Sequence, residues 1–359
     1  MSGIIEYLKW RGDVPFSVTP LNSSDLTVLC EMAYFPFEGI VPDDFKQKIS
    51  LPEACGKCIP RLTESDPFED LEFAEQLAES PRFGDLMLSG FVNVVDEEKQ
   101  FAAYTANAGH GRKYIIFRGT DDSLIGWKED LDLSYSEGVP SQKCAVLYIE
   151  EAVKALKGTF TIAGHSKGGN IAVYGAAFCS NKARSHIEHV YSFDGPGFND
   201  ILLEREQLKA IVPITTTFMP QGSIIGALLQ HKEPVTVVHS LGKDGFEQHK
   251  LQNWQVTPTG VEILEGFSKG GEFADDSLDK WVGKITYEQK KEFVEVFYNM
   301  IRDRETIDNI SIMDMLKSYF KLDKDERRTL NSVIGELGSS LTDTLIESTK
   351  DKKKTEDMH

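Results

Sequence analysis

The central part of the chain alternates short apolar runs with longer segments in which apolar residues recur at helical spacing. The short runs are rich in β-branched and aromatic residues, which is typical of buried strands. They cover residues 159–163, 189–193, 214–219 and 235–240. The segments with helical spacing cover 167–179, 200–209 and 223–229. This alternation predicts a mainly parallel central sheet with helices on both faces.

The N-terminal third has a more mixed pattern. Residues 1–35 are expected to be mostly helical, because the capping residues Asn22 to Asp25 precede the apolar stretch 26–33. Residues 36–90 mix proline, glycine and charged residues with short helical pieces, and we regard them as a candidate cap over a site.

Two strands and a helix are expected before the alternating region. The runs 99–107 and 113–117 read as strands joined by the glycine-containing turn 108–111. Residues 141–156 have helical spacing.

The C-terminal part is expected to be helical. Residues 275–302 carry one apolar stripe, and the chain then becomes amphipathic and finally strongly polar. We therefore expect one α/β domain over 1–303, followed by a docked helical extension and frayed tail over 304–359.

The first candidate chemistry lies between the run 159–163 and the helix 167–179. The motif there is Gly164-His165-Ser166-Lys167-Gly168, and Gly-x-Ser-x-Gly between a strand and a helix is typical of a nucleophile elbow. The glycines allow strand and helix to approach closely, so that Ser166 projects above the sheet edge. The Lys167 N–H, at the helix start, then faces a developing oxyanion. The alternative is an ordinary strand-to-helix turn with an incidental serine.

A serine nucleophile needs a base, and on this pattern the base follows the serine and the acid in the chain. Of the later histidines, His249 lies in a loop after the last strand of the alternating region, where it can reach back to Ser166. The alternative is a histidine of a surface loop.

Asp194 is the first candidate for the acid. It follows the apolar run 189–193 and opens a turn at the edge of the sheet where catalytic groups gather. It could instead be a turn aspartate bonded to its own backbone. Asp244, close to His249 in sequence, is the second candidate.

The second oxyanion donor should come from an early strand-to-helix loop. Gly119 allows a tight turn after the run 113–117, so that the Thr120 N–H can point into the site. The alternative is a polar strand end without a function.

The composition argues against nucleic acid as a partner and against a membrane-spanning segment. The chain has 359 residues, a net charge of −18 and 40% hydrophobic residues, with a pI of about 4.9. An acidic surface repels nucleic-acid phosphates, so we expect no nucleic-acid partner. No segment approaches the ~18 consecutive apolar residues of a membrane span. The N-terminus lacks a basic segment before an apolar core, so we expect a cytoplasmic protein without stable membrane insertion.

The cysteines do not indicate a metal or redox site. There are five, an odd and dispersed set that argues against a disulfide framework. Cys55 and Cys58 form a lone CxxC without the further ligands that zinc needs. We therefore expect no metal and no cofactor.

Several motifs together resemble a known superfamily. Phe117-Arg118-Gly119-Thr120, with Trp127 and Asp130 downstream, and the motif around Ser166 resemble the class 3 (fungal-type) lipases of the α/β-hydrolase superfamily. The sequence is more similar to a poorly characterised bacterial lipase-like family, over roughly residues 1–300. The motifs that carry this second resemblance are residues 7–13, 164–170, 193–198, and Gln248-His249 followed by Trp254.

The resemblance implies an α/β-hydrolase fold and a serine-hydrolase site. It implies Ser166 as nucleophile, His249 as base, and Thr120 and Lys167 as oxyanion donors. The sequence departs from class 3 lipases at Ser223, where those lipases carry their acid, so the acid has moved to Asp194 or the site lacks a strong acid.

The expected activity is hydrolysis of carboxylic esters, either small soluble acyl esters or lysolipids, through an acyl-enzyme. The pairs Leu124-Ile125, Ile224-Ile225 and Leu228-Leu229 could line an acyl pocket, form a small lid, or belong to the core. The alternative function is a non-catalytic hydrolase-like module that binds a ligand or partner.

Overall fold

A central sheet of eight strands organises the chain in a computed structural model that describes residues 3–62, 71–121, 123–301 and 312–356. The strands lie side by side in chain order. They are β1 (Ile49–Ser50), β2 (Met87–Val95), β3 (Gln100–Asn107), β4 (Arg112–Phe117), β5 (Thr159–His165), β6 (Ile187–Phe193), β7 (Thr215–Pro220) and β8 (Val235–Val238). From β1 to β4 neighbours are antiparallel, and from β4 to β8 they are parallel.

Helices surround this sheet. Those before or within it are α1 (Ile4–Arg11), α2 (Ser23–Met32), α3 (Leu51–Cys58), α4 (Leu71–Glu79), α5 (Leu124–Asp132), α6 (Pro140–Ala155), α7 (Lys167–Phe178), α8 (Asn181–Arg184), α9 (Asp200–Leu203) and α10 (Glu206–Ile211). Those after it are α11 (Gly245–His249), α12 (Lys269–Lys284), α13 (Tyr287–Ile301), α14 (Ile312–Lys321) and α15 (Lys324–Glu356). A small second sheet pairs β9 (Val256–Thr257) with β10 (Gly260–Val261).

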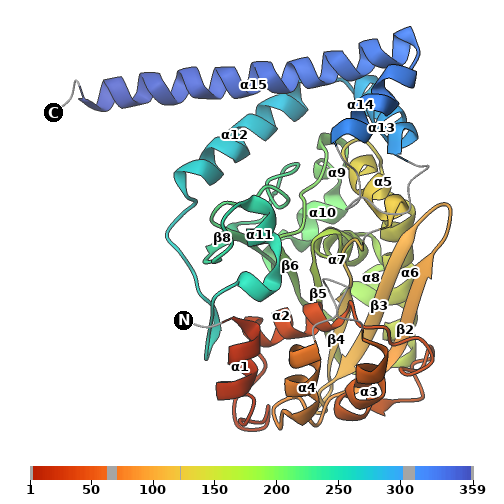
Figure 1. Cartoon of the computed structure of the whole chain (residues 1–359). Coiled ribbons are helices and arrows are strands. Elements are labelled where there is room, and N and C mark those ends of the chain that lie inside the picture. The colour runs from red at the N-terminus through yellow and green to blue at the C-terminus, as the bar shows by residue number, and fades with distance from the viewer. Residues whose placement is uncertain (1–2, 63–70, 122, 302–311, 357–359) are drawn as a thin grey trace.

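The two faces of the sheet bury two separate cores. In β3, Phe101 and Ala103 pack with α6 and α7, whereas Tyr104 and Ala106 pack with α1 to α4. This division follows from the strand period of two, which sends successive side chains to opposite faces. In Figure 1 the N-terminal helices α1 to α4 lie together at the lower end of the molecule. The mainly parallel sheet and these two helical layers give the expected α/β architecture, with helices on both faces of the sheet.

Several sequence expectations can be compared with the elements observed. The hairpin over 99–117 is confirmed, because β3 and β4 pair antiparallel with Ala103 opposite Phe117. Strand β2 was not predicted, although its second half is rich in β-branched residues. The helix expected over 223–229 is wrong, since that segment consists of turns and bends. The helical region expected over 275–302 is divided between α12 and α13.

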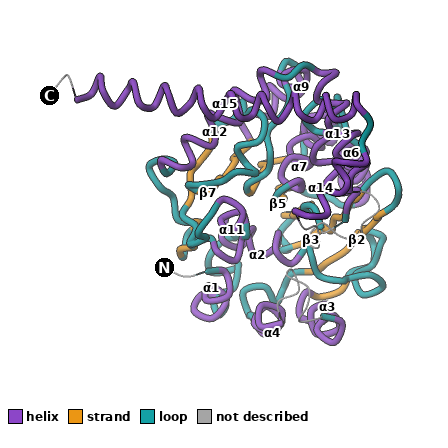
Figure 2. Tube along the Cα trace, turned by 45° about the horizontal axis from the view of Figure 1, so that its top comes forward, coloured by secondary structure: helices purple, strands orange, loops and turns teal. Residues whose placement is uncertain are grey.

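The C-terminal helices form a layer of their own. Helix α15 packs along α12, where Lys280 and Lys284 form ion pairs with Glu347 and Asp343. The far end of α15 extends past the rest of the molecule (Figure 1 and Figure 2). The expected domain boundary at residue 303 lies outside the described residues. No helix in the described ranges is both long and apolar enough to cross a bilayer.

Candidate active site

Ser166 occupies a strained turn between β5 and α7. Its backbone has φ 58° and ψ −132°, a region that non-glycine residues rarely adopt. The turn is held because the Ser166 N–H donates to the Phe193 carbonyl at 3.0 Å. Strand and helix touch here, since a Cβ on Gly164 would lie only 2.1 Å from the Gly168 carbonyl oxygen. This is the backbone that the motif predicted.

Asp194 directly follows the neighbouring strand, β6, and reaches His249. It is fully buried, with a φ of 50°, and its Oδ2 lies 2.7 Å from Nδ1 of His249. The other oxygen, Oδ1, accepts a hydrogen bond of 2.6 Å from the hydroxyl of Ser223. Ser223, where the resemblance to class 3 lipases implied an acid, therefore contacts the carboxylate of Asp194. Both carboxylate oxygens have partners, as a buried charge requires.

Asp244 has a different place. It is the N-cap of α11, where its Oδ1 accepts hydrogen bonds from the N–H groups of Phe246 and Glu247. The cap positions α11, at whose end His249 stands, but the histidine bonds to Asp194. The structure therefore pairs His249 with the first candidate acid and gives the second candidate a capping role.

His249 is fixed at its main chain as well as at its ring. Its carbonyl oxygen accepts a hydrogen bond of 2.9 Å from Nε2 of His165, whose Nδ1 lies 3.2 Å from the Tyr34 hydroxyl. Because a carbonyl only accepts, His165 carries its proton on Nε2 and accepts from Tyr34. Burial, together with the neighbouring His249, lowers the pKa of His165 well below its usual range. His165 is thus a neutral residue that holds the main chain of His249. Since Asp194 bonds Nδ1 of His249, Nε2 is the ring nitrogen that remains available.

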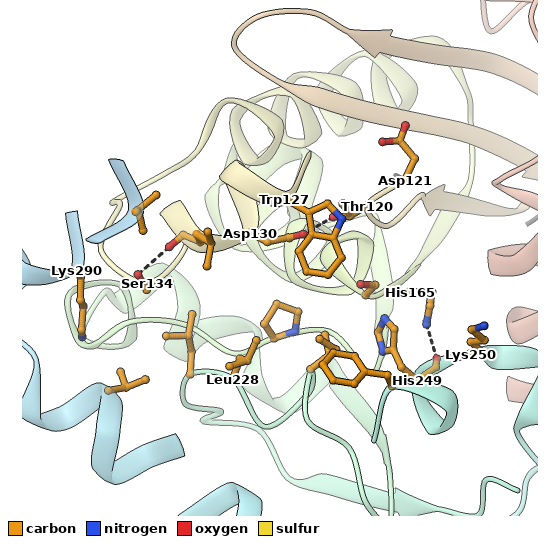
Figure 3. A pocket seen from close by; sticks show the side chains of 18 of the residues that line it. Thr120, Asp121, Trp127, Asp130, Ser134, His165, Leu228, His249, Lys250 and Lys290 are labelled. Atoms are coloured by element: carbon orange, nitrogen blue, oxygen red, sulfur yellow. Dashed lines mark hydrogen bonds between the residues drawn. The ribbon is translucent and has the colours of Figure 1, made fainter. Parts of the chain in front are cut away.

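The loop after β4 runs beside the nucleophile. A Cβ on Gly119 would lie 2.8 Å from the Ser166 Cβ, so only glycine allows this approach. Next to it, the Thr120 hydroxyl donates to Oδ2 of Asp130 (Figure 3). Burial raises the pKa of Asp130 to about 6, and among the described residues its buried Oδ1 has no hydrogen-bond partner.

Lys167 serves the site in two ways. It is the first residue of α7, so its N–H has no acceptor within the helix and remains available beside Ser166. Its side chain turns inward and is completely buried, with Nζ 3.1 Å from Oε2 of Glu129. Nζ also donates to the carbonyl oxygen and the side-chain Oε1 of Gln100.

Ser166 and His249 both line one cavity of about 420 Å³. Figure 3 shows His249 and Thr120 at one end and Lys290 at the other, with Leu228 between them. Its other apolar lining includes Trp127, Leu131, Pro196, Ile225, Leu229, Trp281, Val282, Ile285, Phe293, Val294 and Val333.

The cover of this cavity comes from an unexpected part of the chain. It is formed by side chains of α12, α13 and α15, whereas none of the described residues of 36–90 lines the cavity. That segment instead buries apolar side chains such as Leu51, Phe73 and Leu77 in the core beneath the sheet. Of the candidate acyl-pocket residues, Ile225, Leu228 and Leu229 line the cavity, and Leu124 packs against the core of the C-terminal helices.

The structure supplies no metal site in the parts of the chain that it describes, where no cluster of three potential ligands occurs. Cys55 and Cys58 both lie buried on α3.

Comparison with known proteins places the chain in a family. The family model described as Mbeg1-like matches residues 77–299, which include every candidate site residue. The chain belongs to the Mbeg1-like family. A search of the curated proteins found no match to this Mbeg1-like chain.

Solved structures similar to this Mbeg1-like chain include lipases, at low identity. One described as a fungal lipase is 13% identical, with 69% of this chain and 87% of that chain covered and a TM-score of 0.40. A mutant of MDLA from Penicillium cyclopium is 14% identical, with 70% and 91% covered and a TM-score of 0.41. A Rhizomucor miehei lipase propeptide complex is 14% identical, with 76% and 93% covered and a TM-score of 0.36.

Three residues around the site escaped the sequence analysis. His165 stood inside the motif but had no assigned role, and Gln100 and Glu129 carry no motif that points to Gly119 or Lys167. The only signal for the last two was a lysine directly after Ser166, at the start of the predicted helix. A buried lysine requires an acceptor, but the sequence does not say which one.

Proposed function

We propose that this Mbeg1-like protein hydrolyses carboxylic esters through an acyl-enzyme on Ser166. The observation that carries the proposal is the 2.7 Å contact of buried Asp194 with Nδ1 of His249, in a cavity that Ser166 also lines. A carboxylate on Nδ1 fixes the tautomer of the imidazole and leaves Nε2 to accept a proton.

The steps follow from this arrangement. The base His249 removes the proton of the Ser166 hydroxyl as its oxygen attacks the ester carbonyl. The N–H groups of Lys167 and Thr120 stabilise the oxyanion of the tetrahedral intermediate. His249 then protonates the leaving alcohol, and afterwards it activates the water that releases the acid and restores Ser166. Asp194 stabilises the imidazolium in both halves of the reaction.

The cavity supports a substrate with an apolar acyl part. Its volume of about 420 Å³ lies within the range of roughly 300–1,000 Å³ that encloses a small ligand. The wall between Thr120 and Lys290 is formed mainly by aliphatic and aromatic side chains. We propose an ester or lysolipid whose acyl chain enters this space, and a panel of p-nitrophenyl esters of increasing chain length tests the preference.

Labelling with a fluorophosphonate probe, mapped by mass spectrometry, tests the mechanism. We expect the adduct on Ser166, and Ser166→Ala should lose both labelling and at least about 10⁴-fold in turnover. Ser180→Ala is the matched control, because Ser180 caps the short helix α8 and does not line the cavity. A folded wild type that is neither labelled nor active would support the non-catalytic binding module instead.

A further inference from the structure

The buried ammonium of Lys167 is surrounded by three acceptors. Nζ lies 2.9 Å from the Gln100 carbonyl oxygen, 2.5 Å from Gln100 Oε1 and 3.1 Å from Glu129 Oε2. An ammonium has three protons, so its donor capacity is used completely. Glu129 is held in turn by the N–H groups of Gln100 and Ser141. The side chain of the residue after the nucleophile is therefore locked beneath the site.

Gln100 connects the buried Lys167 side chain to the loop beside Ser166. Because Oε1 faces the ammonium, its Nε2 must point the other way, and it donates to the Gly119 carbonyl oxygen at 3.2 Å. The orientation of the Gln100 amide is thus dictated by Lys167. When the amide oxygen of a glutamine binds a buried cation, its NH₂ group can donate only on the opposite side of the amide.

The Gly119 carbonyl and the Thr120 N–H belong to the same peptide unit. In a trans peptide these two groups point in opposite directions. The carbonyl points to buried Gln100, so the Thr120 N–H points to the opposite side, where Thr120 lines the cavity and Gly119 lies against Ser166. Rotation of this peptide would remove the donor from the site.

The same loop is tied from its other side. The Thr120 hydroxyl bonds to Asp130, the chain neighbour of Glu129, which accepts from Lys167. The contacts therefore form a closed circuit that starts and ends at the residue after the nucleophile. Its members come from β3, the loop after β4, α5 and α7, which are distant in the sequence.

We propose that Lys167 and Gln100 are positioning residues that aim the Thr120 N–H at the oxyanion. On this view Lys167 contributes one donor through its main chain and orients the second through its side chain. The proposal rests on the ester hydrolysis proposed above, and it adds a role for two side chains that do not touch the substrate.

Gln100→Glu is the sharpest test. A glutamate keeps the acceptor for Lys167 and nearly the same shape, but it places an acceptor opposite the Gly119 carbonyl and so should turn the Gly119–Thr120 peptide. We expect kcat on a p-nitrophenyl ester to fall by about 100-fold or more, the usual effect of losing one oxyanion donor. The KM should change by less than about threefold, because the donor acts mainly in the transition state.

Gln100→Met provides a second variant without a new charge, and it should show the same split between kcat and KM. Crystal structures of wild type and both variants give a readout that does not depend on activity, namely the direction of the Gly119 carbonyl. Asp25→Asn, which breaks a buried ion pair whose members do not line the cavity, controls for an effect of lower stability alone.

The outcomes separate the two proposals. If the wild type reacts with no ester and not with the probe, the proposed function is wrong. In that case the direction of the Gly119 carbonyl in the variant structures still tests whether Gln100 orients this peptide. If the wild type is active, a Gln100 variant with kcat within threefold, or with the Gly119 carbonyl unmoved, overturns the positioning role. A turned carbonyl with a selective loss of kcat supports it.

Discussion

Two buried ion pairs stabilise opposite parts of this molecule. Arg82 pairs with Asp25 among the N-terminal segments, and Lys167 pairs with Glu129 beneath the candidate nucleophile. The side chains of both pairs are at most 1% exposed. Both pairs therefore carry a similar desolvation penalty, and they differ in the segments that their hydrogen bonds fix.

The Arg82 pair fastens one structural layer. Its guanidinium makes two bonds of 2.6 Å to Asp25, and it also donates to the carbonyl oxygens of Val14, Thr19 and Pro20. The Tyr7 hydroxyl adds a third donor to the carboxylate. None of these residues lines the cavity, so the whole arrangement serves the attachment of the N-terminal segments.

The Lys167 pair instead holds the loop that we propose to bind the oxyanion. Its partners connect it to the Gly119 carbonyl and, through neighbouring Asp130, to the Thr120 hydroxyl. Although the two pairs are equally buried, a change in the Lys167 pair should therefore affect turnover, and a change in the Arg82 pair should affect only stability. A buried ion pair fixes the segments to which it is hydrogen-bonded, so its partners show whether it serves the fold or the candidate site.

The strongest contrast should come from Asp194→Asn. Asparagine retains the shape but cannot fix the His249 tautomer or stabilise its charged form, so we expect kcat to fall by about 10⁴-fold. A matched measurement on Ser223→Ala, which removes one donor to the same carboxylate, should show a far smaller loss. Equal losses in the two variants would contradict the assignment of Asp194 as the acid.

Lys167→Met should have the next largest effect. It preserves the Lys167 main-chain N–H but releases the Gln100 amide, so kcat should fall by about 100-fold with a smaller change in KM. It also leaves Glu129 as an unpaired buried charge, which should destabilise the fold by about 3–5 kcal/mol. Urea unfolding and ester kinetics on the same samples check both effects. Recovery of stability without kcat in Lys167→Met/Glu129→Gln would show that the two effects are separate.

The sequence predicted the strand, turn and helix around Ser166 because these depend on local backbone requirements. The glycines, the apolar run and the helical spacing all lie within a short segment, and the observed φ of 58° at Ser166 fits them. The relation of Asp194 to His249 spans 55 residues, yet chain order and position at a strand end still indicated it. Parallel strands bring such ends to one edge.

The support beneath the site could not be predicted in the same way. Gln100 begins β3 and Glu129 lies within α5, and neither has a local pattern that specifies contact with Lys167. That helices α12 and α13 line the cavity was not predicted for a related reason. The apolar stripe of 275–302 predicts a helix that packs against something, but it does not indicate which surface. Long-range partners of amphipathic elements are set by tertiary packing, which a single sequence does not encode locally.

Asp130→Asn should affect stability in a pH-dependent way and turnover only modestly. Burial raises the pKa of Asp130 to about 6, so the ionised form is disfavoured in the folded protein. The group therefore contributes stability below the unfolded pKa of about 4, and this contribution is lost as the pH rises through about 6. Asp130→Asn should be more stable than wild type at pH 8, by at most about 3 kcal/mol, with the difference vanishing near pH 4.

Melting curves across pH 4–8 measure this difference directly. Because the asparagine oxygen still accepts from the Thr120 hydroxyl, kcat at pH 8 should stay within about tenfold of wild type. A stability difference that does not depend on pH would show that Asp130 does not change its protonation between the folded and unfolded states in this range.

Asp25→Asn should have the smallest effect on turnover. It leaves the Arg82 guanidinium without a countercharge, so we expect a loss of about 3–5 kcal/mol in the free energy of unfolding. Yet Asp25 bonds to Tyr7, Asn22 and Arg82, none of which lines the cavity, so kcat at a temperature well below the melting transition should stay within about twofold of wild type. A marked fall in kcat with the protein still folded would mean that the N-terminal layer acts on the site through Tyr34 and His165, and that the two buried pairs are not separate.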